Sequence, residues 1–324
     1  MPRRIYRILP VLAALSPLPV AAAPDVAASI APVHSLAAMV MKGVGEPDLI
    51  VPAGASPHGH ALRPSEARAV ERAQVVFRIG PTLETMLDRP LQALATDARV
   101  VDLAKIEGTV VLPTRDDPAW TPHGTDHGHG HDHGDDDHDR GHGHDDGHGH
   151  DHGDEDPHLW LDPANARVWV DAIATVLAEI DPGNADTYRA NADTAREQLN
   201  DLEGKVEARL APVIDVPYVV FHDAYQYFEN RFGTNAIGSI AVYHAAQPGA
   251  ARLSRIREHV RETGAVCAFA EPQFEPRLVR TVIEGTEART GILDPVGADL
   301  EPGPDLYFAL LTDLADDLRT CLED

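Results

Sequence analysis

The sequence predicts an α/β protein of two lobes, each with a mainly parallel sheet, joined by a long rigid helix. Short β-branched segments alternate with helical patterns, first in the N-terminal third and again in the C-terminal third, which is typical of βαβ units. Long helical patterns lie between the two sets. The predicted strands are Val26–Ile30, Asp48–Val51, Val75–Ile79, Arg99–Leu103, Tyr218–Phe221, Ala236–Ala241, Val266–Ala270 and Gly291–Leu293.

Two long helices are predicted between the lobes. The first begins at Pro163 behind Asp162, because aspartate caps helix N-termini and proline suits the first helical position. Apolar residues then recur on one face as far as Ile180. The second carries apolar residues at helical spacing from Tyr188 to Leu210, with a charged opposite face, and we expect it to be a stiff connector. Shorter helices are predicted at Ser65–Ala73 and Pro81–Ala95.

The N-terminus has the pattern of a secretory signal peptide. Three arginines precede an apolar stretch from Ile8 to Val20, and small residues follow it. Cleavage after Ala22 is favoured over the next bond, which would leave Pro24 at the new N-terminus. The apolar stretch is too short to span a bilayer, so we expect a soluble protein outside the cytoplasm. The predicted parts are a signal peptide over 1–23, an N-terminal lobe over 24–183, a linker helix over 184–211 and a C-terminal lobe over 212–324.

The chain is strongly acidic, with a formal net charge of −25. This charge argues against nucleic acid or an anionic membrane surface as a partner, because both would repel the protein. Residues 123–156 contain eleven histidines, eleven aspartates and nine glycines, with no aliphatic or aromatic side chain. Such a segment cannot form a core, so we expect a disordered loop over 117–156 that interrupts the N-terminal lobe.

This His/Asp/Gly tract predicts metal binding. Neutral imidazole is the usual nitrogen ligand of zinc, copper and nickel, and the aspartates attract cations. Ordering a flexible chain costs entropy, so each site should be weak and unselective. A solvated acidic linker is the alternative interpretation. The candidate ligands are His123, His127, His129, His131, His133, His138, His142, His144, His148, His150 and His152.

A selective site needs a rigid set of ligands, and four residues outside the tract are candidates. His58, His158 and His222 lie where predicted strands or turns lead into loops, and Asp294 follows the last strand. Ligands of open α/β sheets bind at the carboxyl ends of the strands. If the two lobes face each other, these residues can meet in the interlobe cleft. Three imidazoles and one carboxylate suit Zn²⁺ but do not exclude Cu²⁺ or Ni²⁺.

The only two cysteines, Cys267 and Cys321, favour a disulfide. Remote cysteines in an oxidising compartment tend to pair. A role as zinc ligands is the weaker alternative, because neither cysteine has another Cys or His at metal-site spacing.

The chain resembles the ZnuA type of high-affinity zinc-binding proteins that serve bacterial ABC importers. The resemblance extends over the mature chain in the right order. It is carried by Pro32–Leu36, Val51–His58, Leu62–Ser65, Asp156–Pro163, Phe221–Tyr225, Phe269–Phe274 and Leu293–Gly297.

The resemblance implies two lobes, a rigid linking helix and one zinc in the cleft, held by His58, His158 and His222. Some zinc members place Glu immediately before the first ligand histidine; Pro57 stands there in this sequence, which favours Asp294 or a water as fourth ligand. The resemblance also implies the Cys267–Cys321 disulfide and a His-rich loop. His60 is read as a side chain of the cleft wall. Glu271 is a candidate to orient a ligand histidine through its second nitrogen.

The sequence thus predicts a periplasmic zinc carrier, not an enzyme, that delivers Zn²⁺ to the membrane permease of an ABC transporter. Its loop would collect zinc weakly, and periplasmic zinc donor proteins are further candidate partners. We expect a monomer. One alternative is a metal buffer that works through the loop alone. The other is a zinc hydrolase, which the sequence disfavours because it has no His-Glu-x-x-His helix.

Overall fold

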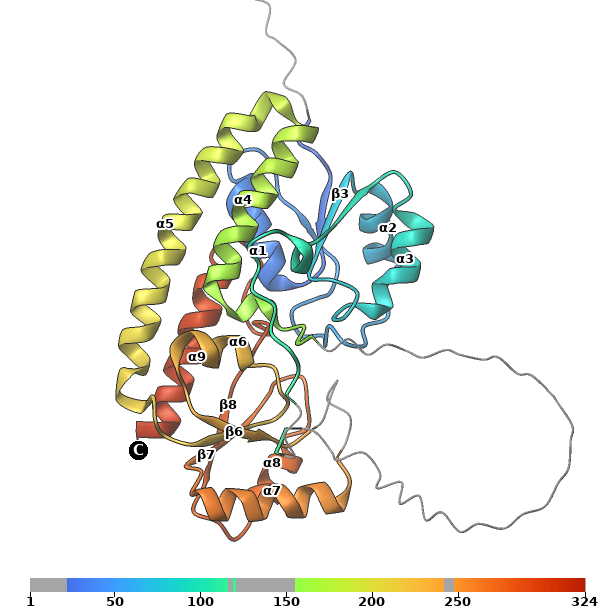
Figure 1. Cartoon of the computed structure of the whole chain (residues 1–324). Coiled ribbons are helices and arrows are strands. Elements are labelled where there is room, and N and C mark those ends of the chain that lie inside the picture. The colour runs from blue at the N-terminus through green and yellow to red at the C-terminus, as the bar shows by residue number, and fades with distance from the viewer. Residues whose placement is uncertain (1–21, 116–118, 121–154, 242–247, 324) are drawn as a thin grey trace, which may run out of the picture.

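The computed structural model describes residues 22–115, 119–120, 155–241 and 248–323. It has two lobes, one above the other in Figure 1, with long helices running beside both. Residues 1–21 of the predicted signal peptide and 121–154 of the predicted loop lie outside the described residues. Among the described helices, none combines the length and apolar character that a membrane span requires.

The N-terminal lobe contains a four-stranded parallel sheet in the order β2-β1-β3-β4. All four predicted strands are confirmed, each ending one or two residues earlier than expected. The elements are β1 (Val26–Ala28), α1 (Ala31–Met41), β2 (Asp48–Leu49), α2 (Pro64–Arg72), β3 (Val75–Arg78), α3 (Asp88–Leu94) and β4 (Arg99–Asp102).

The helix predicted over Pro81–Ala95 is shorter than expected, because α3 begins only at Asp88. The segment before it turns around the side chain of Glu84. This carboxyl accepts hydrogen bonds from the backbone amides of Ile79 at 3.1 Å and Gly80 at 2.9 Å. A side chain that accepts hydrogen bonds from backbone amides four and five residues earlier stabilises a turn in place of a regular helix.

The C-terminal lobe repeats the arrangement, with parallel strands in the order β6-β5-β7-β8. All four strand predictions are confirmed, although the last strand begins two residues earlier than expected. The elements are β5 (Tyr218–Val220), α6 (Gln226–Phe232), β6 (Ala236–Ser239), α7 (Ala250–Thr263), β7 (Cys267–Ala270), α8 (Arg277–Ile283), β8 (Arg289–Ile292) and α9 (Leu306–Glu323).

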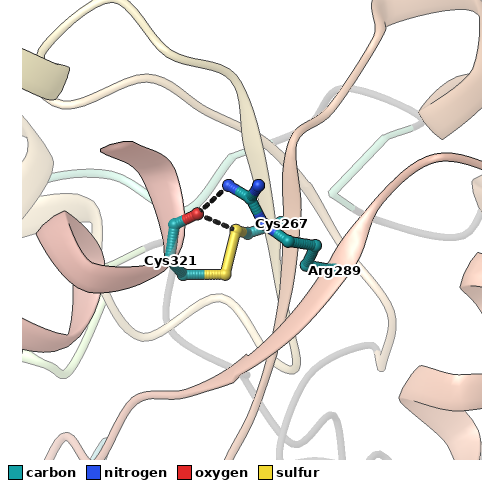
Figure 2. The surroundings of a disulfide bond; sticks show 3 residues. All are labelled: Cys267, Arg289 and Cys321. Carbon is teal, nitrogen blue, oxygen red and sulfur yellow. Dashed lines mark hydrogen bonds between the residues drawn. A yellow bond between two sulfur atoms is a disulfide. The ribbon is translucent and has the colours of Figure 1, made fainter. Parts of the chain in front are cut away.

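The predicted disulfide is confirmed. Cys267 of β7 and Cys321 of α9 are joined with an S–S distance of 2.01 Å across 54 positions of sequence. Figure 2 shows the guanidinium of Arg289 donating to the carbonyl oxygen of Cys321. The terminal helix is therefore tied to the centre of the C-terminal sheet.

The two long helices between the lobes are α4 (Pro163–Ile180) and α5 (Ala185–Leu210). Asp162 caps α4 as predicted, its side chain accepting a hydrogen bond from the amide of Ala164 at 2.8 Å. A stripe of α5 is buried, and α5 packs against α4, α1 and α9, which lie in different lobes (Figure 1). Its stiffness as a connector thus comes from packing along its length as well as from helical structure.

A second link between the lobes is formed by the residues that flank the His/Asp/Gly tract. Pro113 forms an antiparallel bridge with Glu155. Further along, the carbonyl oxygen of Ala119 accepts from the amide of Ser239 at 3.1 Å, at the edge of the C-terminal sheet. The segment before the tract therefore reaches the C-terminal lobe.

Candidate metal centre

Three histidines from three separate segments meet between the lobes. His58 lies in the loop after β2, and His222 follows β5. His158 precedes a short 3₁₀ turn that leads into α4. One ring nitrogen of each lies within 4.8 Å of the others, and in the described part of the chain no other group of this kind was found. The sequence predicted that these three histidines would meet between the lobes, and in the structure they do. Their role as metal ligands stays a prediction.

The spacing of these nitrogens suits a tetrahedral ion. Nε2 of His58 and Nε2 of His158 are 3.2 Å apart. Zn–N bonds of about 2.0–2.1 Å at tetrahedral angles place two ligand nitrogens about 3.3–3.4 Å apart. The ring centroids are 5.2–5.8 Å apart and the rings meet edge to face, as rings must when their tips point to one centre. His158 and His222 are buried and His58 is half-buried.

Two carboxylates fix the far nitrogens of the buried histidines. Glu271 Oε1 lies 2.6 Å from His222 Nδ1, and Asp156 Oδ1 lies 2.7 Å from His158 Nδ1. A carboxylate there holds the proton on Nδ1 and leaves the Nε2 lone pair for a metal. His222 Nε2 indeed has no hydrogen-bond partner among the described residues.

Burial and neighbouring charges act on the pKa values of His222 and Asp156 in opposite directions. Burial acts to lower the pKa of His222, but the charge and the hydrogen bond of Glu271 outweigh it and raise that pKa above its ordinary value. Burial raises the pKa of Asp156 to about 7, against the hydrogen bond from the His158 amide and the charges of Arg115 and His222. Both carboxylates are almost wholly enclosed beside the imidazoles.

The sequence predicts Glu271 as a residue that orients a ligand histidine, but it does not predict Asp156 in the same role. Asp156 was counted with the His/Asp/Gly tract, in which aspartate is one of the commonest residues. A local signal was present, since Asp156 precedes His158 by two positions with Pro157 between, and its carboxylate also accepts from the His158 amide at 3.0 Å. The abundance of aspartate in the tract therefore obscured the role of Asp156, which its contact with His158 shows.

Asp294 lies outside the group of three histidines, and its predicted role as fourth ligand, with water as the alternative, stays a prediction. Its Oδ1 accepts from the amides of Val296 and Gly297, at 3.1 and 3.0 Å, and its Oδ2 from the amide of Ala298. These bonds turn the carboxylate into its own loop. The position of Asp294 after the last strand predicts that it lies at the carboxyl edge of the C-terminal sheet. The direction of its side chain is set by the backbone amides that donate to it.

The other candidates lie apart from the three histidines or beyond the described residues. His60 Nε2 contacts Glu66 Oε2 at 2.7 Å, so its ring is engaged at the start of α2. His60 is also absent from the lining of the cavity between the three histidines. The tract histidines, from His123 to His152, all fall within residues 121–154, which the structure does not describe.

The cavity between the three histidines is small and mostly apolar around its rim. Its volume is about 10 Å³, and its lining includes Pro57, Trp160, Gln273, Phe274 and Val296. The His222 ring has Phe274 at a centroid distance of 5.8 Å, and the His158 ring has Trp160 at 5.3 Å. The small volume and the three ring nitrogens fit a single ion.

Two α/β lobes with a small cavity between loops from both are the architecture of a solute-binding protein. The chain belongs to the ZnuA family: the family model described as "Zinc-uptake complex component A periplasmic" matches residues 26–321. Members of this family are periplasmic solute-binding proteins and not enzymes, which removes the hydrolase alternative.

Relatives and solved structures agree with this assignment. The high-affinity zinc uptake system protein ZnuA of Brucella abortus is 49% identical over 304 residues, covering 92% of this chain and 91% of the relative. The protein of the same name from Paracoccus denitrificans is 42% identical over 303 residues, covering 92% of each chain. In fold, the periplasmic zinc-binding protein TroA from Treponema pallidum matches with a TM-score of 0.73 at 18% identity, covering 93% of this chain and 99% of that one.

Proposed function

We propose that this protein captures one Zn²⁺ ion in the periplasm, through His58, His158 and His222, and delivers it to the membrane permease of an ABC transporter. The observation that carries the proposal is the convergence of three imidazole nitrogens, two of them 3.2 Å apart, between the lobes. The family and the zinc-uptake names of the relatives support zinc as the cargo.

The ligand chemistry supports the same choice. Three imidazoles favour a borderline ion such as Zn²⁺ over Mg²⁺, Ca²⁺ or Mn²⁺, which prefer sites richer in oxygen. Glu271 and Asp156 add negative charge behind the rings without occupying a coordination position. Copper and nickel remain competitors on ligand type alone, so availability and geometry must supply that part of the selectivity.

The His/Asp/Gly tract is proposed as an accessory collector. Its eleven histidines would bind zinc weakly and raise the local concentration of the ion. The described residues on either side of the tract lie near the three histidines. Glu155 precedes His158 by three positions, and Arg115 ion-pairs with Glu229 at 2.8 Å and lies 3.6 Å from Asp223, the neighbour of His222.

Zinc titrations of single variants test the tight site. His58→Ala, His158→Ala and His222→Ala should each lower the affinity for zinc by at least about 100-fold, because three remaining ligands at most can hold the ion. His60→Ala is the matched control, since that ring contacts Glu66 and not the histidine group, and it should leave the affinity within about twofold. Retention of tight zinc by all three ligand variants would refute the site.

The second candidate function, a buffer that acts through the tract alone, makes the opposite prediction for a deletion. A chain lacking residues 123–154 should keep one tightly bound zinc if the histidine group is the main site. A tract-only buffer should lose all bound zinc. Counting zinc per chain after dialysis against a weak chelator distinguishes the two functions.

A further inference from the structure

One more acceptor atom lines the cavity, and no described residue bonds to it. Gln273 belongs to the lining together with the three histidines. Its Oε1 is buried and has no hydrogen-bond partner among the described residues. A buried carbonyl oxygen without a partner costs free energy, unless a ligand compensates for it. Gln273 Oε1 and His222 Nε2 are therefore both buried and without a hydrogen-bond partner among the described residues, as expected of atoms that bind a cation.

The orientation of this amide is fixed by Asp294. Gln273 Nε2 donates to Asp294 Oδ1 at 3.1 Å. The opposite orientation of the amide would place its carbonyl oxygen against a carboxylate, with two acceptors and no proton between them. The interaction with Asp294 therefore holds the nitrogen on one side and directs Oε1 to the other.

Asp294 itself is poorly placed to bind the ion. Three backbone amides and the Gln273 side chain already donate to its two oxygens. A carboxylate moved onto the metal would leave those donors to find other acceptors. Water is the other expected fourth ligand, and the spectrum of the cobalt-substituted protein distinguishes it from Gln273.

We propose that Gln273 completes the metal site, with its side-chain Oε1 as the fourth ligand of an ion held by His58, His158 and His222. Asp294 is then a positioning residue, acting through the Gln273 amide. This inference rests on the proposed zinc site. It gives that site four neutral ligands, so the compensating negative charge comes from Glu271 and Asp156, which lie behind the histidines.

Cobalt substitution reads the fourth ligand directly. Co²⁺ replaces Zn²⁺ in tetrahedral sites, and its visible spectrum changes when a bound water loses a proton, which for zinc-bound water happens near a pH of about 7. The Co²⁺ spectrum of the wild-type full chain should stay constant between pH 6.5 and 9, because Gln273 leaves no coordination position for water. In Gln273→Ala a water should enter, and the spectrum should become dependent on pH.

Zinc affinity gives the second readout. Gln273→Ala should weaken binding by about 10–100-fold while the unfolding temperature of the metal-free protein stays close to that of the wild type. Asp294→Asn should shift the Co²⁺ spectrum in the same direction as Gln273→Ala, since it disturbs the amide and leaves the three histidines in place. A Gln273→Leu variant, which keeps the volume of the side chain, separates loss of the oxygen from loss of packing and should lower the zinc affinity as Gln273→Ala does.

The outcomes are distinguishable. If the wild-type spectrum titrates like that of Gln273→Ala, or if both Gln273 variants keep full zinc affinity while His58→Ala loses it, Gln273 is not the fourth ligand and the zinc site stands. If His58→Ala also keeps tight zinc, the histidine site is refuted and the role of Gln273 with it.

Discussion

Glu271 Oε1 accepts a hydrogen bond from His222 Nδ1 at 2.6 Å, across 49 positions of sequence. His222 follows β5 and Glu271 follows β7, and the two strands are neighbours in the C-terminal sheet. The same carboxylate oxygen lies 3.3 Å from the backbone amide of His222. Parallel pairing of two strands thus engages Nδ1 of the His222 ring and leaves Nε2 without a hydrogen-bond partner among the described residues.

Removing the charge of Glu271 should weaken zinc binding. In Glu271→Gln, a hydrogen bond to His222 can persist, but the carboxylate no longer raises the basicity of the ring or offsets the charge of the ion. We expect the dissociation constant for zinc to rise by about 10–100-fold at pH 7. Competition titration against a chelator measures it. Glu66→Gln, which changes the partner of His60, is the control and should have little effect on affinity.

Asp156→Asn should act in the same way on the other buried histidine. The structure gives Asp156 the relation to His158 that Glu271 has to His222, with an Oδ1–Nδ1 distance of 2.7 Å. The expected loss of zinc affinity is again about 10–100-fold. If Asp156→Asn leaves the affinity unchanged, the carboxylate serves only the fold of the segment after the tract. The melting temperature of the metal-free variant then falls although zinc binding does not.

The fold was predictable because its signals are local. Eight short β-branched segments, an Asp-Pro helix start and a long amphipathic stretch each specify an element without reference to the others. His58 and His222 were predictable by the rule that parallel strands present ligands at their carboxyl ends, and His158 by its place just before the helix start at Asp162. What that rule omits is the direction of a side chain: three backbone amides donate to the Asp294 carboxylate, which lies outside the group of three histidines. Gln273 went unnoticed for a different reason, since a neutral amide gives no sequence signal for metal.

Acid should release the bound zinc. Protons and the ion compete for the same imidazole lone pairs, so affinity falls as the pH drops. Zinc affinity measured at intervals from pH 7.5 to 5 should therefore decrease steadily, and by more than tenfold per pH unit at the acid end, where more than one histidine takes up a proton. Affinity that stays level down to pH 5 would contradict a site built on three imidazoles.

A buried carboxyl in the N-terminal lobe makes the stability of that lobe depend on pH. Burial raises the pKa of Glu84 from 4.5 to about 7, against hydrogen bonds from Ser29, Gly80 and Ile79. Because the folded pKa lies above the unfolded one, its contribution to stability is fully present below about pH 4.5 and is lost as the pH rises through about 7. The full loss is about 3.5 kcal/mol, at about 1.4 kcal/mol per pKa unit.

The Glu84→Gln variant isolates the contribution of Glu84 ionisation to the free energy of unfolding. Glutamine cannot ionise, so the difference in unfolding free energy between variant and wild type should shift toward the variant by about 2 kcal/mol between pH 5 and pH 8. Other buried acids contribute equally to both chains and cancel in that difference. Urea denaturation of the metal-free proteins at several pH values measures the shift. A difference that is independent of pH would show that Glu84 is ionised in the folded protein throughout this range.

The disulfide should matter for stability much more than for binding. Cys267 and Cys321 close a loop with a sequence separation of 54 residues, and this restricts the unfolded chain. Replacing both cysteines by alanine should lower the free energy of unfolding by about 2–4 kcal/mol. Zinc affinity should change little, since neither cysteine lines the cavity of the three histidines. A large loss of affinity would instead mean that the position of Glu271, which directly follows β7, depends on the bond between that strand and α9.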